Sequence, residues 1–124
     1  MLLVKTYISA SSIHGIGLFA AESIAKGTVI WRFDERVDRR FTKKEREDLP
    51  EPARSFVATY SYPEFVGSDV YLVDGDHARF MNHSDTPNTD CEVDTIATRS
   101  IAVGEELLCD YRQFHPEYKL YRMT

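Results

Sequence analysis

The chain has 124 residues, enough for one compact domain, and 43% of them are hydrophobic, as in ordinary globular proteins. Its formal net charge is -5, which disfavours nucleic-acid binding because that needs a basic surface. No apolar run is long enough to cross a membrane or to act as a signal peptide. Only two cysteines occur, Cys91 and Cys109, so neither a disulfide framework nor a four-thiolate zinc site is indicated. We expect an intracellular protein, by default a cytoplasmic one, without direct contacts to nucleic acid or membrane.

Short strands are predicted over most of the chain. Residues 2–8 and 28–33 alternate in polarity and carry β-branched or aromatic side chains, which favours strands. Further short strands are expected at residues 70–73, 94–98 and 106–108. Glycine and proline are spread along the chain and mark no linker. The pattern predicts one mainly β domain.

Helix signals are confined to the middle of the chain. Thr42 and Glu45 have the spacing of a capping box, which predicts a short helix that ends before Pro50. A second short helix is predicted from Pro52 onward. One face of that helix would present Ala53, Phe56, Val57 and Tyr60. Both helices form a small insert in the β domain.

One segment occurs twice in loosely similar form. Residues 19–30 and 96–107 share an alanine, the triplet Ser-Ile-Ala, a glycine turn (Gly27 and Gly104) and a following strand. Such a repeat indicates two similar β units packed as halves of one core. It carries no information about catalysis.

Three polar segments could carry chemistry. In the first, Gly15 and Gly17 flank Ile16, and such glycines let a backbone approach a ligand closely. No third glycine follows, so the segment does not match a dinucleotide-binding motif. An ordinary turn is the alternative reading.

The second segment, residues 79–88, places Asn82, His83, Ser84 and Asp85 in one stretch. A capped turn would explain the same residues structurally. A serine-hydrolase triad fits poorly because Ser84 adjoins His83 and lacks a nucleophile elbow. A metal site fits poorly because no second histidine or cysteine stands at ligand spacing.

The third segment, residues 104–114, is typical of a turn followed by a strand and a polar exit. Within it, Tyr111 is expected to be half buried with its hydroxyl hydrogen-bonded. In this order, the three segments resemble motifs of the SET-domain family of protein-lysine methyltransferases. The matching stretches are Gly-Ile-Gly-Leu-Phe-Ala, Arg-Phe-Met-Asn-His-Ser with Pro-Asn, and Gly-Glu-Glu-Leu with Asp-Tyr. The resemblance covers residues 3–114, and residues 115–124 form a short tail that could close the cofactor site.

The resemblance implies a β-clip fold in which the C-terminal segment threads under a loop as a pseudoknot. It also implies S-adenosylmethionine as cofactor and Tyr111 as the catalytic tyrosine. The cofactor would contact the backbone of Gly15, Ile16 and Gly17, together with Asn82, His83, Tyr111 and Phe114. The channel for the substrate lysine would include Tyr60 and Cys109.

The chemistry suits these residue types. Methyl transfer to an amine needs a neutral nucleophile, but a free lysine has a pKa of about 10.4. Burial in a dry aromatic channel lowers a lysine pKa by up to about 3 to 5 units. Alignment of the two substrates supplies most of the remaining rate enhancement. No metal is required.

Two residues depart from the family pattern. Asp85 stands where many members have a cysteine that binds a zinc ion after the SET domain, and residues 115–124 contain no cysteine. We therefore expect no zinc, and closure of the channel by Phe114, Tyr118 or Tyr121. Cys109 stands where the family often has an aromatic residue, which leaves the number of methyl groups transferred open.

The expected function is methylation of lysine in a protein substrate, for which the acidic chain would suit a basic tail. One alternative is a non-catalytic β-clip module that binds a peptide or protein. The other is an unrelated small β domain with a coincidental motif. The presence of Asn82, His83 and Tyr111 together favours the enzyme, because a binding module has no chemical need for them. A homodimer is one arrangement that would complete the substrate groove.

Overall fold

A computed structural model describes residues 1–115, and in this range the chain forms short strands, two α-helices and two 3-10 turns. The strands are β1 (Thr6–Ala10), β2 (Ile16–Ala20), β3 (Val29–Trp31), β4 (Arg39–Thr42), β5 (Tyr62–Pro63), β6 (Val70–Val73), β7 (Asn82–His83), β8 (Thr89–Asp90), β9 (Thr95–Ala97) and β10 (Leu108–Cys109). The helices are α1 (Lys43–Glu47) and α2 (Ala53–Tyr60), and the 3-10 turns are η1 (His77–Phe80) and η2 (Tyr111–Gln113). The mainly β fold with a helical insert is confirmed.

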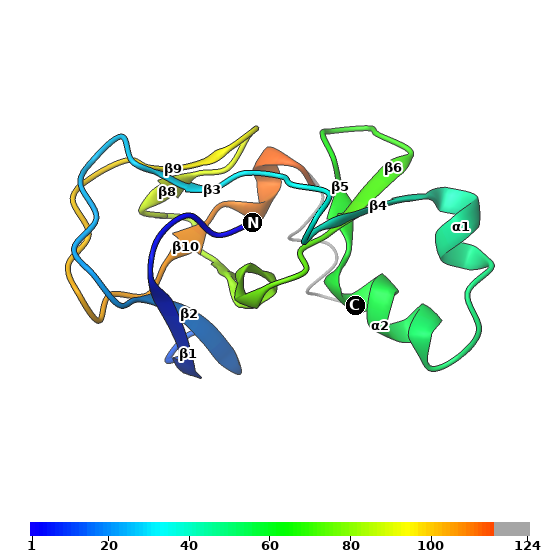
Figure 1. Cartoon of the computed structure of the whole chain (residues 1–124), viewed down its shortest axis with the longest axis horizontal. Coiled ribbons are helices and arrows are strands. Elements are labelled where there is room, and N and C mark those ends of the chain that lie inside the picture. The colour runs from blue at the N-terminus through cyan, green and yellow to red at the C-terminus, as the bar shows by residue number, and fades with distance from the viewer. Residues whose placement is uncertain (116–124) are drawn as a thin grey trace.

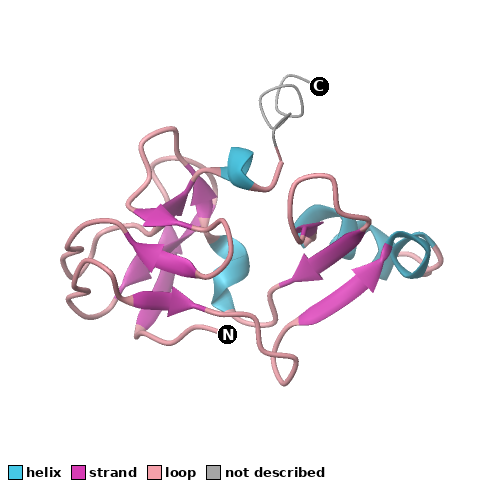
Figure 2. Cartoon of the chain, turned by 90° about the horizontal axis from the view of Figure 1, so that it is seen from above, coloured by secondary structure: helices cyan, strands magenta, loops and turns pink. Residues whose placement is uncertain are grey.

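The elements gather into two groups, seen side by side in Figure 1 and again in the turned view of Figure 2. We call residues 1–33 and 76–115 the core lobe, which contains β1–β3 and β7–β10. Residues 34–75 form the insert lobe, with β4, α1, α2, β5 and β6. The core lobe holds the pairs β1–β2 and β7–β10 and the sheet β3–β9–β8, whereas the insert lobe holds the sheet β4–β6–β5.

The predicted strands are present, with shifted ends. β6 has the bounds expected for residues 70–73, and β3 and β9 lie inside their predicted runs. The run predicted at residues 2–8 is divided, because Leu2 bridges to Trp31 whereas β1 pairs with β2. The run at residues 106–108 begins later, as β10, and Glu106 forms only an isolated bridge to Phe19.

The two copies of the repeated segment pair with each other. Residues 19–30 run antiparallel to residues 96–107, and at their centre Ile24 and Ile101 exchange backbone hydrogen bonds of 2.9 and 2.8 Å. The matching glycines of the two copies both have φ of +87°. Both copies contribute buried apolar residues to one cluster, among them Ile24, Ile30, Ile101 and Leu107. The prediction of two β units forming halves of one core is confirmed.

The helical insert begins as the capping box predicts. The Thr42 hydroxyl accepts from the Glu45 N–H at 3.1 Å, and the Glu45 carboxylate accepts from the Thr42 N–H at 3.0 Å. Helix α2 starts at Ala53, and on its predicted apolar face only Val57 is fully buried. Phe56 remains 43% exposed, so this face covers less core than its pattern indicates.

The C-terminal segment passes through the loop at residues 82–89. β10 pairs in parallel with β7 on one side of the loop. On the other side, Asn88 bonds the backbone at Glu106 and Leu108, both at 2.9 Å, and the Thr89 hydroxyl donates to the Leu108 carbonyl at 2.8 Å. The segment at residues 106–109 is thus bonded to both ends of the loop at residues 82–89. This is the arrangement expected of the threaded segment that the resemblance implies.

Three buried clusters hold the molecule together. The largest lies in the core lobe and includes Leu18, Ile30 and Leu107, each fully buried. A small one, built on Phe41 and Val57, lies in the insert lobe. A third cluster joins the lobes, because it packs Trp31 of the core lobe with Leu72 of the insert lobe. No helix among residues 1–115 has the length and apolar character needed to cross a bilayer.

Candidate active site

Tyr111 is held at three points. Its hydroxyl donates to the Met81 carbonyl oxygen, and its backbone N–H donates to His83 Nδ1 at 3.0 Å. Its ring lies edge-on to the His83 ring at 5.4 Å and 5.5 Å from the ring of Phe114. The residue is half buried, so the predicted environment of a half-buried tyrosine with a bonded hydroxyl is confirmed.

A cavity of about 560 Å³ lies where the two lobes meet, and Tyr111 forms part of its wall. The insert lobe contributes Tyr60, Tyr62 and Tyr71 to this wall. The core lobe contributes Trp31, Met81, Cys91, Cys109, Tyr111 and Phe114. The structure thus brings Tyr60 together with Cys109, Tyr111 and Phe114, which come from a distant segment of the sequence.

Aromatic rings pack along this cavity. Phe114 lies 4.9 Å from Tyr62, so it bridges the insert lobe to Tyr111. Tyr60 contacts Phe56 at 4.9 Å and meets the edge of Phe80 at 6.0 Å. Of the residues expected to close the channel, Tyr118 and Tyr121 lie outside the described part of the chain.

A buried carboxyl on the cavity wall was not predicted from the sequence. The Tyr62 hydroxyl donates to Asp74 Oδ1 at 2.6 Å, and both residues line the cavity. Burial raises the pKa of Asp74 to about 6, although the bond from Tyr62 lowers it. Burial, with the adjacent Asp74 charge, also raises the pKa of Tyr62. At pH 7 the wall therefore carries a negative charge that would attract a cationic substrate.

Cys109 occupies the predicted channel position as a buried thiol. The neighbouring Cys91 thiol and burial raise the Cys109 pKa well above its usual value. Cys91 in turn donates to Gln113 Oε1 at 3.1 Å. Cys109 is thus a neutral, apolar part of the wall, and the rings of Tyr62 and Phe114 line the same cavity.

Asn82 and the glycine segment form a polar cluster outside the lining of the 560 Å³ cavity. Asn82 Nδ2 donates to the His14 carbonyl at 2.9 Å, the Ile16 carbonyl at 3.2 Å and Glu106 Oε2 at 3.1 Å. The Ser11 hydroxyl also donates to the Glu106 carboxylate, at 2.7 Å. Glu106 was missed from sequence because its acceptor role depends on partners 24 and 95 residues away.

The two glycines of this segment serve different purposes. A Cβ on Gly17 would lie 2.6 Å from Glu106 Oε2, so a side chain at this position would displace the Glu106 carboxylate from its bonds to Asn82 and Ser11. Gly15 has φ of +47° and open space where a Cβ would be, and its carbonyl accepts from the Ser11 N–H at 2.8 Å. The cofactor contacts expected of Gly15, Ile16 and Gly17 stay predictions. None of these residues lines the 560 Å³ cavity.

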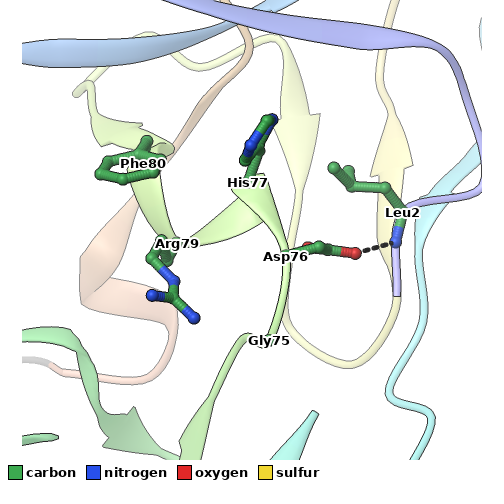
Figure 3. A pocket seen from close by; sticks show the side chains of 6 residues that line it. All are labelled: Leu2, Gly75, Asp76, His77, Arg79 and Phe80. Atoms are coloured by element: carbon green, nitrogen blue, oxygen red, sulfur yellow. Dashed lines mark hydrogen bonds between the residues drawn. The ribbon is translucent and has the colours of Figure 1, made fainter. Parts of the chain in front are cut away.

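A smaller cavity, of about 380 Å³, is lined by Leu2, Gly75, Asp76, His77, Arg79 and Phe80 (Figure 3). On one side of it the Leu2 N–H donates to Asp76 Oδ2 at 2.8 Å. Arg79 also borders the larger cavity, and its guanidinium donates to the Asp74 carbonyl at 3.0 Å. The two cavities thus share Arg79 as a common wall.

The site contains no cluster typical of a metal centre within residues 1–115, where no three His, Cys, Asp or Glu side chains are placed to hold an ion. Asp85, at the position of the family's cysteine, instead bonds His83 Nε2 at 2.9 Å. The expected absence of zinc stays a prediction for the purified protein.

Comparison with known proteins agrees with the motifs. The SET-domain family model matches residues 15–112. Human histone-lysine N-methyltransferase 2D is 31% identical over 117 residues, which are 87% of this chain and 2% of that protein. An H3 lysine-4 specific histone-lysine N-methyltransferase of Mycosarcoma maydis is 35% identical over 115 residues, 82% of this chain and 8% of that protein. The chain thus spans a small fraction of the length of these curated relatives.

Solved structures show the same fold. A Chaetomium thermophilum polycomb repressive complex 2 structure, autoinhibited and bound to S-adenosylmethionine, aligns with a TM-score of 0.66 at 21% identity, over 96% of this chain and 17% of that one. A candidate histone methyltransferase of Plasmodium falciparum aligns with a TM-score of 0.60 at 24% identity, over 89% and 95% of the two chains. With its three motifs, its threaded C-terminal segment and these matches, the chain belongs to the SET-domain family.

Proposed function

We propose that the chain is a protein-lysine N-methyltransferase that uses S-adenosylmethionine. The observation that carries the proposal is the aromatic cavity between the lobes, with Tyr111 on its wall. The family membership and the names of the relatives support the same reaction. The backbone of Gly15 and Ile16, with Asn82, His83, Tyr111 and Phe114, would hold the cofactor. When bound, S-adenosylmethionine supplies an electrophilic methyl group.

The residues of the chain would prepare the lysine. The rings of Tyr60, Tyr62 and Phe114 exclude water, and exclusion of water lowers the pKa of an amine. The Asp74 carboxylate, ionised above pH 6, would attract the incoming ammonium group, although its charge opposes the loss of the amine proton that the aromatic rings promote. The Tyr111 hydroxyl, bonded to the Met81 carbonyl, would orient the amine in the line of attack. Such alignment contributes up to about 7 to 11 kcal/mol to rate enhancement.

The substrate that we propose is a basic protein tail, with histone tails as the first candidates. Two observations support this choice. Relatives bear the name histone-lysine N-methyltransferase, and the net charge of -5 favours cationic partners. The same names give no support to a cytoplasmic location. We retain only an intracellular one, supported by the free thiols Cys91 and Cys109.

Labelled methyl transfer tests the proposal. The 124-residue chain is incubated with S-adenosylmethionine carrying a labelled methyl group and with core histones, and mass spectrometry locates the label. We expect label on lysine side chains, whereas label on arginine or no label on any protein of a whole lysate would contradict the proposal. Counting methyl groups per lysine would settle the multiplicity that Cys109 leaves open. Light scattering of the same sample tests the homodimer.

A further inference from the structure

Asp85, His83 and Tyr111 form a continuous chain of hydrogen bonds. Asp85 Oδ1 lies 2.9 Å from His83 Nε2, and the Tyr111 N–H donates to His83 Nδ1 at 3.0 Å. The His83 side chain is only 9% exposed, whereas the Asp85 side chain is 59% exposed. A surface carboxylate is thereby linked, through a buried ring, to the backbone of the proposed catalytic tyrosine.

The hydrogen-bond donors that face the His83 ring determine which of its two nitrogens carries the proton. A backbone N–H can only donate, so Nδ1 must be the unprotonated, accepting nitrogen of the ring. The proton of the neutral imidazole then lies on Nε2, which donates to Asp85. The hydrogen bond at one ring nitrogen fixes the role of the other. Loss of the Asp85 carboxylate would remove one of the two partners that favour this tautomer.

Neighbouring charges hold the carboxylate near the ring. Arg112 Nη2 lies 3.5 Å from Asp85 Oδ1 and 2.6 Å from Asp110 Oδ2. The guanidinium lowers the pKa of Asp110. Asp110 Oδ1 lies 3.8 Å from His83 Nδ1, a separation too long for a hydrogen bond. Arg112 therefore ties the loop of Asp85 to the turn η2, in which Tyr111 is the first residue.

We propose that Asp85 is a positioning residue for the methyl transfer. Through His83 it keeps Nδ1 as an acceptor for the Tyr111 N–H, and so holds the Tyr111 hydroxyl at the cavity. The inference rests on the proposed function but concerns a residue outside the cavity wall. Asp85 stands at the position where many members of the family have a cysteine.

The first test is a double-mutant cycle on turnover. Asp85→Ala should lower kcat about three- to tenfold, the size of one modest hydrogen bond, with the KM of a lysine peptide within twofold. Asp85→Asn, which keeps an accepting oxygen, should recover most of kcat. In a His83→Phe background, Asp85→Ala should have almost no further effect. Asp48→Ala is the matched control, since the Asp48 side chain is 62% exposed and also ion-paired.

The second test needs no methyl transfer and so stands apart from the proposed function. Long-range nitrogen–proton NMR at pH 8 should show the His83 ring with its proton on Nε2, assigned by its loss in His83→Phe. Asp85→Ala should speed exchange of the Tyr111 amide proton about three- to tenfold, while Asp48→Ala leaves it unchanged. A proton on Nδ1 in the parent, or unchanged amide exchange in Asp85→Ala, would overturn the inference. An inactive parent that passes this test would contradict only the proposed function.

Discussion

The core lobe and the insert lobe are stabilised in different ways. In the core lobe, buried polar side chains such as Asn82, Asn88 and Thr89 all bond backbone atoms of other segments. In the insert lobe, Asp38 and Asp74 are buried, but other charged groups pair at the surface, as in the Lys44–Asp48 ion pair. Arg39 and Arg46 lie over aromatic rings. The insert lobe also has the smaller apolar cluster.

This difference explains how the site is built. The core lobe fixes Tyr111 by interlocked hydrogen bonds, which any change would disturb. The insert lobe supplies Tyr60, Tyr62 and Asp74 to the same cavity from a lobe with a smaller apolar cluster. Under the proposed function, the wall that carries Tyr111 would therefore be held more firmly than the wall that faces it.

Cavity-forming substitutions should show the largest difference in unfolding free energy between the two lobes. Leu107→Ala, at a fully buried core-lobe position, should lower the free energy of unfolding by about 3 to 5 kcal/mol. Val57→Ala, in the smaller cluster of the insert lobe, removes less volume and should lower it by about 1 to 2 kcal/mol. Urea unfolding of both variants measures the comparison. Equal losses would mean that the lobes do not differ in packing.

Asp74→Asn should show a pH-dependent gain in stability. The Asp74 pKa is about 6 in the fold against an ordinary 3.8, so the folded state binds more protons between these values. Stability from this group is therefore complete below about pH 4 and is lost as pH rises through 6. Relative to the parent, Asp74→Asn should gain about 3 kcal/mol between pH 4 and pH 7. Thermal unfolding across this range checks it, and a pH-independent difference would contradict the burial of the charge.

Asn82→Ala should destabilise the fold and weaken cofactor binding together. Its amide donates to the His14 and Ile16 carbonyls and to Glu106, so its removal leaves buried acceptors unpaired, at about 1 to 3 kcal/mol. If it also bonds the cofactor, affinity should fall about ten- to a hundredfold. Calorimetry on the folded variant separates the two effects. Parent-like affinity with a much lower melting temperature would make Asn82 purely structural.

The smallest effect is expected at the surface of the insert lobe. Lys44 and Asp48 form an ion pair of 2.6 Å on α1, with side chains 83% and 62% exposed. Exposed pairs of this kind contribute about 0.5 kcal/mol or less. Lys44→Ala should therefore leave the urea midpoint nearly unchanged, and the small shift should decrease further in high salt. A loss above about 1 kcal/mol would show that α1 is more important for the insert lobe than its surface pairs indicate.

Features set by neighbouring residues were predictable from sequence. The capping box of Thr42 and Glu45, the strand at residues 70–73 and the paired repeats depend on local spacing or on a recurring pattern. The three motifs that carry the family resemblance are also local. Each of these signals lies within a short window of the chain or is repeated in it.

Partners far apart in sequence were not predictable. Nothing near Glu106 indicates that it accepts from Ser11, a residue 95 positions away. The Tyr62–Asp74 bond depends on the fold that brings two polar residues into a buried wall. The two ring nitrogens of His83 are bonded to Tyr111 and Asp85, and no local pattern indicates the bond to Tyr111. These pairings depend on tertiary register, which composition and periodicity do not encode.

The central claim is that the Tyr111 hydroxyl acts on the reacting groups at the cavity. Single-turnover methyl transfer to a lysine peptide, at saturating S-adenosylmethionine, tests it with the Tyr111→Phe variant. Tyr7→Phe serves as control, because Tyr7 is 41% exposed and stacks on Phe19 away from the cavity. We expect Tyr111→Phe to lose about a hundredfold or more in rate, with cofactor affinity within a few-fold, and Tyr7→Phe to match the parent. Equal rates for the parent and Tyr111→Phe would contradict the account.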